Sequence, residues 1–135
     1  MAEPTVRASY GGVAYQVKVS DGQHAWLGDV PAELGGGDTG PTPHQLLLSA
    51  LGACTSITLA MYAQRKGIPL ESIDVDLSVV QERLGQASQV EIGRDIRLSG
   101  ALTDEQRARL LEIANACPIH KVLSGEVRIT SVLVE

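Results

Sequence analysis

The chain has 135 residues, of which 44% are hydrophobic, 20% charged and 3% aromatic, and its formal net charge is −5. This length and apolar content suit one globular domain spanning residues 1–135. The net negative charge and the scattered Lys and Arg residues argue against a nucleic acid or an anionic membrane surface as a partner. The N-terminal residues lack the basic and apolar stretches of a secretory signal, which predicts a cytoplasmic protein.

The first forty residues predict strands and turns. Residues 13–19 alternate between apolar and polar side chains, as expected for a half-buried strand, and residues 24–27 suit the other arm of a hairpin. Residues 35–43 are rich in Gly and Pro and predict a loop that approaches another part of the molecule closely.

Residues 43–66 predict a long helix. Thr42 places a capping hydroxyl before Pro43, and Gly67 ends the pattern. Residues 46–63 carry no charge, so we expect this helix to be buried on several sides at the centre of the fold. The same run is near the lower length limit for crossing a bilayer, but the hydroxyl side chains within it favour a core helix.

The second half of the chain predicts two or more strands, two further helices and a final strand. The strand signals lie at residues 73–79, 90–92 and 96–98, the helices begin at the capping box Thr103–Gln106 and at Cys117-Pro118, and the closing strand covers residues 127–134. This order of elements predicts an α+β domain with a mainly antiparallel sheet.

Cys54 lies within the long predicted helix among small side chains. A cysteine in an apolar helix is most often an inert core residue. Gly52 is a second unusual feature of the same turn, because glycine inside a helix costs about 1 kcal/mol relative to alanine. We therefore expect a kink or a close approach of another element near Cys54.

Cys117 directly precedes Pro118, and proline suits the first position of a helix. Cys117 would then be the N-cap, where unpaired N–H groups lower the pKa of a thiol, and His120 and Lys121 would add positive charge. In the other interpretation, the proline merely ends the preceding helix. Both interpretations are open at this point.

The spacing Cys117-x-x-His120 also resembles that of zinc ligands. A structural zinc site normally has two such pairs, and the other candidate ligands, Cys54, His24 and His44, form no second pair. No metal or other cofactor is therefore expected. The serine-hydrolase elbow Gly-x-Ser-x-Gly and the phosphate-binding loop ending in Gly-Lys-Ser/Thr do not occur in the sequence.

Three segments together resemble the OsmC/Ohr family, which comprises osmotically inducible protein C and organic hydroperoxide resistance proteins. Residues 40–58 are similar to the signature around the family's reactive cysteine, and residues 61–70 to its continuation. Residues 116–121 are similar to the motif of the second cysteine. The resemblance extends from about Gly35 to the C-terminus.

This resemblance implies a single OsmC-like domain with antiparallel sheets around a long buried central helix, in an intertwined homodimer. It also implies a thiol peroxidase for organic hydroperoxides. The Cys54 thiolate would attack the peroxide and become a sulfenic acid, Cys117 would form a disulfide with it, and a lipoyl-type dithiol would reduce that disulfide. The alternative is a non-enzymatic OsmC-like protein that senses redox state or binds an apolar ligand.

Two positions depart from the pattern of the best-known peroxidase branches. Those branches have Glu ten residues before the reactive cysteine, where this chain has His44, and an activating Arg where residues 11–13 read Gly-Gly-Val. Arg7 is a candidate replacement for the activating Arg, and His44 and His120 are further candidates for accessory roles beside Cys54.

Overall fold

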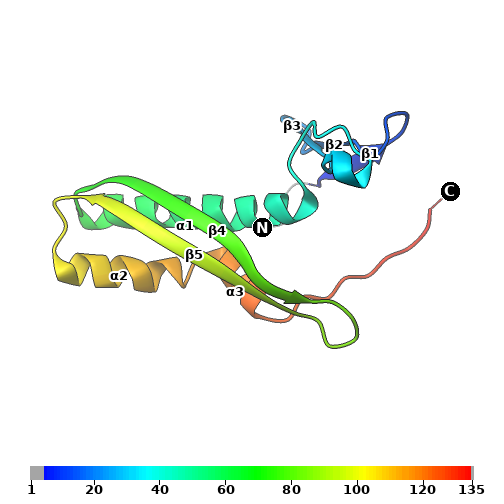
Figure 1. Cartoon of the computed structure of the whole chain (residues 1–135). Helices are drawn as coiled ribbons and strands as arrows, with labels where there is room; N and C mark the ends of the chain where they lie inside the picture. Colours follow the sequence, from blue (N-terminus) through cyan, green and yellow to red (C-terminus); the bar gives the residue numbers. More distant parts are fainter. Residues whose placement is uncertain (1–4, 135) are drawn as a thin grey trace. The chain divides into compact units, whose positions relative to one another are not determined.

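A computed structural model of the chain describes residues 5–134 (Figure 1). The chain divides between Ser49 and Ala50 into two compact units, and each is described by itself. The first contains three short strands and the start of the long helix α1 (Pro43–Lys66). The second contains the rest of α1, a long strand pair and two further helices.

The N-terminal unit is built on an antiparallel sheet in the order β1-β2-β3, formed by β1 (Arg7–Tyr10), β2 (Val17–Ser20) and β3 (Ala25–Gly28). The predicted hairpin of β2 and β3 is confirmed, whereas β1 was not predicted. The strand predicted from residue 13 begins only at Val17, because Tyr15 has a positive φ of 64° and turns the chain.

The Gly- and Pro-rich loop lies against the end of β3, after the 3-10 helix η1 (Ala32–Leu34). The buried carboxylate of Asp29 accepts hydrogen bonds from the Val30 N–H at 2.7 Å, the Thr39 N–H at 3.0 Å and the Thr39 hydroxyl at 2.6 Å. A Cβ at Gly36 would lie 2.2 Å from the Val30 carbonyl oxygen, so only glycine fits there. The close approach predicted for this loop is thus to residues 29 and 30, directly after β3.

Helix α1 has the predicted ends. The Gln45 N–H donates to the Thr42 hydroxyl at 3.2 Å, and the Gln45 side-chain oxygen accepts from the Thr42 N–H at 2.9 Å, which forms a capping box. At the other end, the Ile68 N–H donates to the Ala63 carbonyl at 2.9 Å and so satisfies one carbonyl of the last turn.

The C-terminal unit is a long antiparallel hairpin packed against the remainder of α1 and the first helix after the hairpin (Figure 1). The strands are β4 (Leu70–Arg83) and β5 (Gln89–Gly100), and the helices that follow are α2 (Asp104–Ala114) and α3 (Pro118–Ser124). The two strand signals in residues 90–98 belong to the single strand β5. Leu59 of α1 and Leu110 and Ala114 of α2 are fully buried against apolar side chains of both strands.

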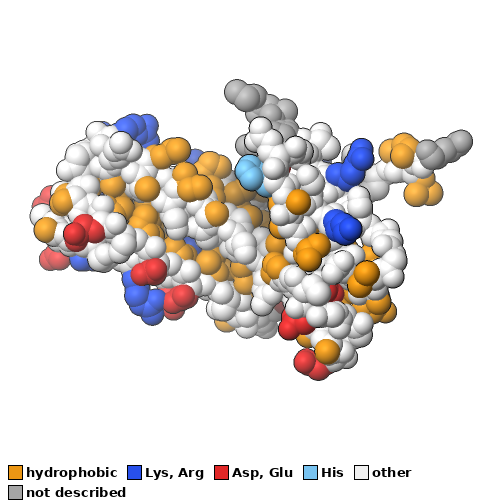
Figure 2. All heavy atoms as spheres, turned by 90° about the horizontal axis from the view of Figure 1, so that it is seen from above, with side chains coloured by type: hydrophobic (Ala, Val, Ile, Leu, Met, Phe, Trp, Pro, Cys, Tyr) orange, Lys and Arg blue, Asp and Glu red, His pale blue; other side chains and the backbone are white. Residues whose placement is uncertain are grey.

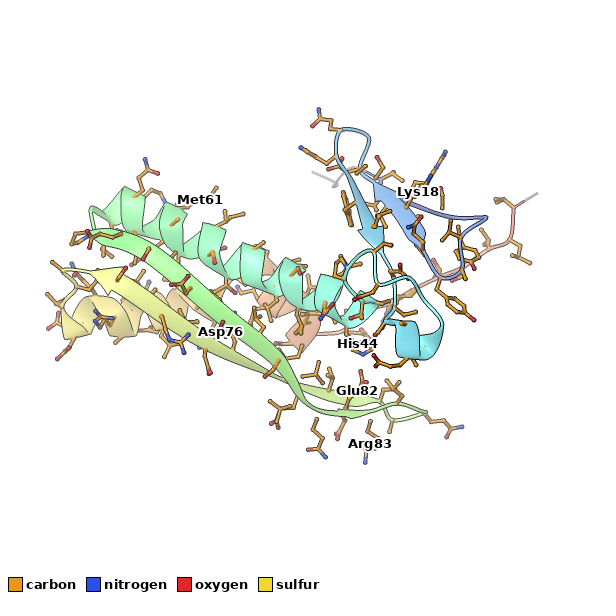
Figure 3. The ribbon with its side chains drawn as sticks, turned by 45° about the horizontal axis from the view of Figure 1, so that its top comes forward. Lys18, His44, Met61, Asp76, Glu82 and Arg83 are labelled. Carbon is orange, nitrogen blue, oxygen red and sulfur yellow. The ribbon has the colours of Figure 1, made fainter. Side chains whose placement is uncertain are left out.

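Within the single chain, the long helix is buried along one stripe rather than on several sides. The stripe consists of Leu51, Thr55, Leu59 and Ala63, spaced four residues apart. On another side of α1, Ile57 and Met61 are 54% and 60% exposed. Figure 3 shows Met61 directed away from the strands, and Figure 2 shows hydrophobic side chains gathered over this region. The two strands and α2 of a single chain cover only one side of the helix.

By length and composition alone, α1 is also apolar enough to cross a membrane. The core helix of a soluble protein satisfies the same criteria. The buried stripe packs against β4, β5 and α2. This packing accounts for the apolar character of the stripe without a bilayer.

The closing strand predicted for residues 127–134 is not formed. Residues 126–134 have no assigned secondary structure, and the apolar side chains there are exposed, including Ile129 at 85% and Leu133 at 103%. A strand requires hydrogen bonds to a neighbouring strand edge, and none of the described strands pairs with this segment. The fold is otherwise the predicted α+β arrangement of antiparallel strands and a long helix.

We predict that Asp29→Ala lowers the free energy of unfolding by about 2 kcal/mol, because three partly buried donors lose a charged acceptor. The donors around Asp29 hold the pKa of its carboxyl below the usual range, mainly through the Thr39 hydroxyl. Its contribution is therefore present at neutral pH and lost as pH falls through that lowered pKa. Urea titrations followed by the fluorescence of Trp26, the single tryptophan, measure the difference.

The exposed acid Glu33 in the neighbouring 3-10 helix η1 is the matched control, and Glu33→Ala should leave stability within about 0.5 kcal/mol of wild type. Equal losses in both variants, or a loss for Asp29→Ala that persists undiminished in acid, would contradict this account.

Candidate active site

Cys54 lies on α1 in the C-terminal unit, one residue before the buried stripe residue Thr55, and its side chain is partly exposed. The Cys54 sulfur accepts a hydrogen bond from the backbone N–H of Ile119 at 3.5 Å. The Thr58 hydroxyl, one turn further along α1, lies 3.9 Å from the same sulfur. Cys54 is thus in contact with the first turn of α3.

Cys117 is the N-cap of α3, and Pro118 occupies the first helical position. This confirms the capping interpretation over the one in which proline only ends the preceding helix. The Cys117 sulfur accepts a hydrogen bond from the His120 N–H at 3.3 Å, and the side chain is fully buried. The Cys54 thiol lies near this sulfur and contributes to lowering the pKa of the Cys117 thiol. Two sulfurs 63 residues apart in the sequence therefore meet in one cluster.

The surroundings of Cys117 favour its thiolate. Burial raises the pKa of the Cys117 thiol, but hydrogen bonds from His120, Cys54 and Thr55 and the positive charge of Arg94 outweigh burial and hold the pKa below its ordinary value. Both cysteines are free thiols in this structure. The arrangement is a pair of reduced sulfurs, of which Cys117 loses its proton more readily than an ordinary cysteine.

Arg94 of β5 is the cation of this cluster, and it holds four partners at once. One terminal nitrogen donates to the Thr55 hydroxyl at 3.0 Å and to the Ala114 carbonyl at 3.3 Å. The other donates to the Asn115 side-chain oxygen at 2.9 Å and contacts Nδ1 of His120 at 3.2 Å. All four terminal N–H bonds of the guanidinium are thereby used. Arg94 joins β5 to α1, α2 and α3.

His120 lies beside the same cluster. Its Nδ1 atom is 3.2 Å from the Arg94 guanidinium, which can only donate. The positive charge that lowers the pKa of the Cys117 thiol is that of Arg94.

Gly52 marks the close approach expected near Cys54. A Cβ at Gly52 would lie 2.8 Å from the Cδ1 atom of Leu77 on β4. Leu77 pairs with Arg94 across the hairpin. The missing side chain at position 52 thus lets α1 approach the strands at the level of the arginine that contacts Thr55.

The other candidate residues belong to the N-terminal unit. Arg7 is the first residue of β1 and is exposed, and His44 lies in the first turn of α1. The predicted roles of Arg7 and His44 beside the reactive thiol are not tested by this arrangement. Among residues 5–134, no group of three His, Cys, Asp or Glu side chains is placed to hold a metal ion.

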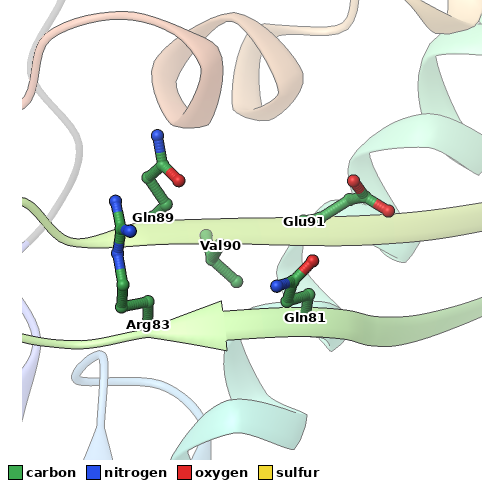
Figure 4. A pocket seen from close by; sticks show the side chains of 5 residues that line it. All are labelled: Gln81, Arg83, Gln89, Val90 and Glu91. Atoms are coloured by element: carbon green, nitrogen blue, oxygen red, sulfur yellow. The ribbon is translucent and has the colours of Figure 1, made fainter.

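Two surface cavities of the C-terminal unit contain neither sulfur. One, of about 390 Å³, lies over the far end of the hairpin and is lined mainly by polar side chains from both strands (Figure 4). The other, of about 570 Å³, lies between α1 and the start of β4, and its apolar lining includes Ile57, Ala60, Ile68 and Ile73.

Arg94 was not recognised in the sequence, although its register contains a signal. Ile92, Ile96 and Leu98 occupy alternate positions of β5 and are at least partly buried, and Arg94 occupies the same alternation. A charged residue on the inward face of a strand requires buried polar partners. Asn115, immediately after α2, supplies one of them.

The sequence pattern that defines the OsmC-like protein family matches residues 35–132 of the chain. This range contains α1, the long hairpin, α2 and α3 with both cysteines. The fold and the paired sulfurs thus define an α+β protein of OsmC type. The chain belongs to the OsmC-like family.

Solved structures show the same fold. An OsmC-like protein from Mycoplasma pneumoniae has 18% identity and a TM-score of 0.79, over 92% of this chain and 89% of its own. The organic hydroperoxide resistance protein OsmC of Legionella pneumophila has 22% identity and a TM-score of 0.66, over 90% and 88%. An organic hydroperoxide resistance protein from Elizabethkingia anophelis has 21% identity and a TM-score of 0.69, over 93% of this chain and 90% of its own. No curated protein sequence matches.

We predict that Arg94→Gln lowers the free energy of unfolding by about 2–3 kcal/mol, because the partners on three helices lose a charged donor. Arg97→Gln is the matched control on the same strand, since Arg97 is exposed and pairs only with the exposed Asp76 among the described salt bridges. Arg97→Gln should lower the free energy of unfolding by only about 0–1 kcal/mol. Urea denaturation followed by circular dichroism compares the two, and equal losses would contradict the role of Arg94 as a structural link.

Proposed function

We propose that this protein reduces organic hydroperoxides, with Cys54 as the attacking sulfur and Cys117 as its disulfide partner. The observation that carries the proposal is the proximity of the two free thiols, despite their separation of 63 residues: the Cys54 sulfur accepts from the Ile119 N–H, two residues after Cys117. Their difference in exposure supports the division of roles. A peroxide from solvent can meet the partly exposed Cys54, whereas Cys117 is fully buried and reaches only its neighbours.

The proposed cycle balances in atoms and electrons. The Cys54 thiolate attacks the outer oxygen of the hydroperoxide, the O–O bond breaks, and the alkoxide leaves to become an alcohol. The Cys54 sulfenic acid then condenses with Cys117, which forms the disulfide and releases water. An external dithiol, of the lipoyl type by the family resemblance, reduces this disulfide by thiol–disulfide exchange in the cytoplasm. The dithiol is oxidised, and both protein thiols are restored.

The family supports this proposal at a coarser level. Some proteins with the same fold are organic hydroperoxide resistance proteins, among them those of Legionella pneumophila and Elizabethkingia anophelis. The departures at His44 and at residues 11–13 leave the activation of Cys54 to other groups. Arg7 stays a candidate for that role.

We also propose that the protein acts as a homodimer. The exposed apolar side of α1, with Ile57 and Met61, is one surface that a second copy would cover. Residues 127–134 form another, because their apolar side chains are exposed and their backbone pairs with none of the described strands. An intertwined dimer, as the family resemblance implies, would account for both.

A second candidate function is the binding of an apolar ligand without turnover. The cavity of about 570 Å³ beside α1 favours it, because its lining is mainly apolar and its volume suits a small organic molecule. Both functions involve the same fold, and they differ in whether a hydroperoxide is consumed.

We predict that the purified protein consumes cumene hydroperoxide in the presence of dihydrolipoamide and that Cys54→Ser reduces the rate to that of the reductant alone, because the nucleophile is removed. Ser49→Ala, an exposed position on the same helix, is the control and should retain the wild-type rate. Peroxide loss is followed colorimetrically. If wild type and Cys54→Ser are equally inactive over several organic hydroperoxides, the binding function replaces the peroxidase.

A further inference from the structure

The first turn of α3 is hydrogen-bonded to both sulfurs of the site. The Ile119 N–H donates to the Cys54 sulfur at 3.5 Å, and the His120 N–H donates to the Cys117 sulfur at 3.3 Å. Pro118 precedes these two residues and has no N–H. Consecutive backbone donors of one turn therefore bind the two sulfurs, so a displacement of this turn relative to α1 changes the distance that a disulfide must close.

Arg94 links the backbone beside each cysteine through one nitrogen. Nη1 of Arg94 donates to the Thr55 hydroxyl at 3.0 Å, and Thr55 directly follows Cys54. The same nitrogen donates to the Ala114 carbonyl at 3.3 Å, and that carbonyl also accepts from the Cys117 N–H at 3.3 Å. A single guanidinium nitrogen thus connects the neighbour of one cysteine to a carbonyl that binds the backbone of the other.

The other partners of Arg94 extend this link to α3. Thr55 and Ala114 are fully buried. Nη2 of Arg94 donates to the Asn115 side-chain oxygen at 2.9 Å and lies 3.2 Å from Nδ1 of His120. Because the planar guanidinium keeps its two terminal nitrogens at a fixed spacing, the contacts on α1, at the end of α2 and on α3 cannot shift independently.

We propose that Arg94 is the positioning residue of the disulfide-forming step, because its hydrogen bonds hold Cys117 within reach of the oxidised Cys54 sulfur. The role deepens the peroxidase proposed above and rests on it for the source of the sulfenic acid. Cys117 loses its proton and attacks the Cys54 sulfur, so that the S–S bond forms and the S–O bond of the sulfenic acid breaks. The hydroxide that leaves takes up the proton as water. Arg94 acts through its hydrogen-bond partners and is not a catalytic residue.

Position limits this step because both reacting sulfurs belong to one chain. A well-oriented pair reacts far faster than free thiols in solution, and a misplacement of about 1 Å can cost about a hundredfold in rate. A sulfenic acid that waits for its partner is open to further oxidation to sulfinic acid. Loss of the Arg94 link should therefore slow disulfide formation while the partly exposed Cys54 keeps its first reaction.

Dithionitrobenzoate, an aromatic disulfide, separates the two reactions without a hydroperoxide. The partly exposed Cys54 attacks the reagent and releases one aromatic thiolate, and the buried Cys117 then displaces the second as the protein disulfide forms. We expect Arg94→Gln to slow the second release by about tenfold or more and to leave the first within about twofold of wild type. A second release at the wild-type rate, or a first release slowed as much as the second, would overturn the proposal.

Leu98→Ala is the matched control for lost stability. Leu98 lies on the same strand and packs against the buried core, whereas the described hydrogen bonds of Arg94 involve other residues. We expect Leu98→Ala to lower the urea midpoint of unfolding at least as far as Arg94→Gln, with the second release at the wild-type rate. An equally slowed second release in Leu98→Ala would reduce the effect of Arg94 to general stability and overturn the proposal.

The rate at high pH separates position from charge. Burial raises the pKa of the Cys117 thiol, while the hydrogen bond from His120 and the charge of Arg94 are among the causes that lower it, so Arg94→Gln also reduces ionisation. Well above the ordinary thiol pKa of about 8.5, Cys117 is ionised in every variant. We expect the slow second release of Arg94→Gln to persist there. Arg94→Lys keeps the charge but has one nitrogen, and its rate should lie nearer to Arg94→Gln than to wild type. A difference that vanishes at high pH, or full recovery with lysine, would overturn the proposal.

Thr55→Val tests the same link if Arg94→Gln does not fold. Valine is close to threonine in volume, but it removes the hydroxyl that accepts from Arg94. We expect its second release to slow by about threefold or more, and a wild-type rate would overturn the proposal.

The aromatic disulfide keeps this inference separable from the peroxidase. If wild type consumes no hydroperoxide but Arg94→Gln slows only the second release, the peroxidase is wrong and the positioning role stands. If wild type consumes hydroperoxide and Arg94→Gln releases both aromatic thiolates at the wild-type rates, the peroxidase stands and the positioning role is wrong.

Discussion

The hydrogen bonds of Arg94 hold the C-terminal unit in the arrangement that brings its two sulfurs together. Cys54 lies on α1, and Cys117 caps α3, so their proximity requires these helices to keep a fixed position on the hairpin. One guanidinium on β5 contacts both helices and the end of α2. Because four donors are satisfied at once, the burial of this charge is compensated by hydrogen bonds to every element that meets at the site.

Around this arginine, the surrounding residues have complementary roles. Gly52 lets α1 approach Leu77, the cross-strand partner of Arg94, so Thr55 comes within reach of the guanidinium. The same cation lowers the pKa of the Cys117 thiol from across the site. The residue that links the elements of the fold is therefore also the one whose positive charge favours the Cys117 thiolate.

Much of this arrangement was predictable from local chemistry. Capping boxes at Thr42 and Thr103, and proline after Cys117, located the starts of the helices because these signals act within four residues. Arg94 was missed because its partners are 20 to 39 residues away in the sequence, and only the alternation along β5 indicates its inward direction. The closing strand at residues 127–134 was wrongly predicted for a related reason. Alternating apolar residues identify a segment able to pair, but pairing depends on a strand edge that sequence periodicity does not supply.

The account depends on Cys54 and Cys117 of one chain lying within bonding reach in the reduced protein. The most direct measurement treats dilute, reduced protein with one equivalent of diamide and determines the mass and the linked peptides under denaturing conditions. The account predicts a monomer that has lost two hydrogen atoms and contains a Cys54–Cys117 peptide. Two thiols that both remain open to alkylation, or links only between chains, would contradict it.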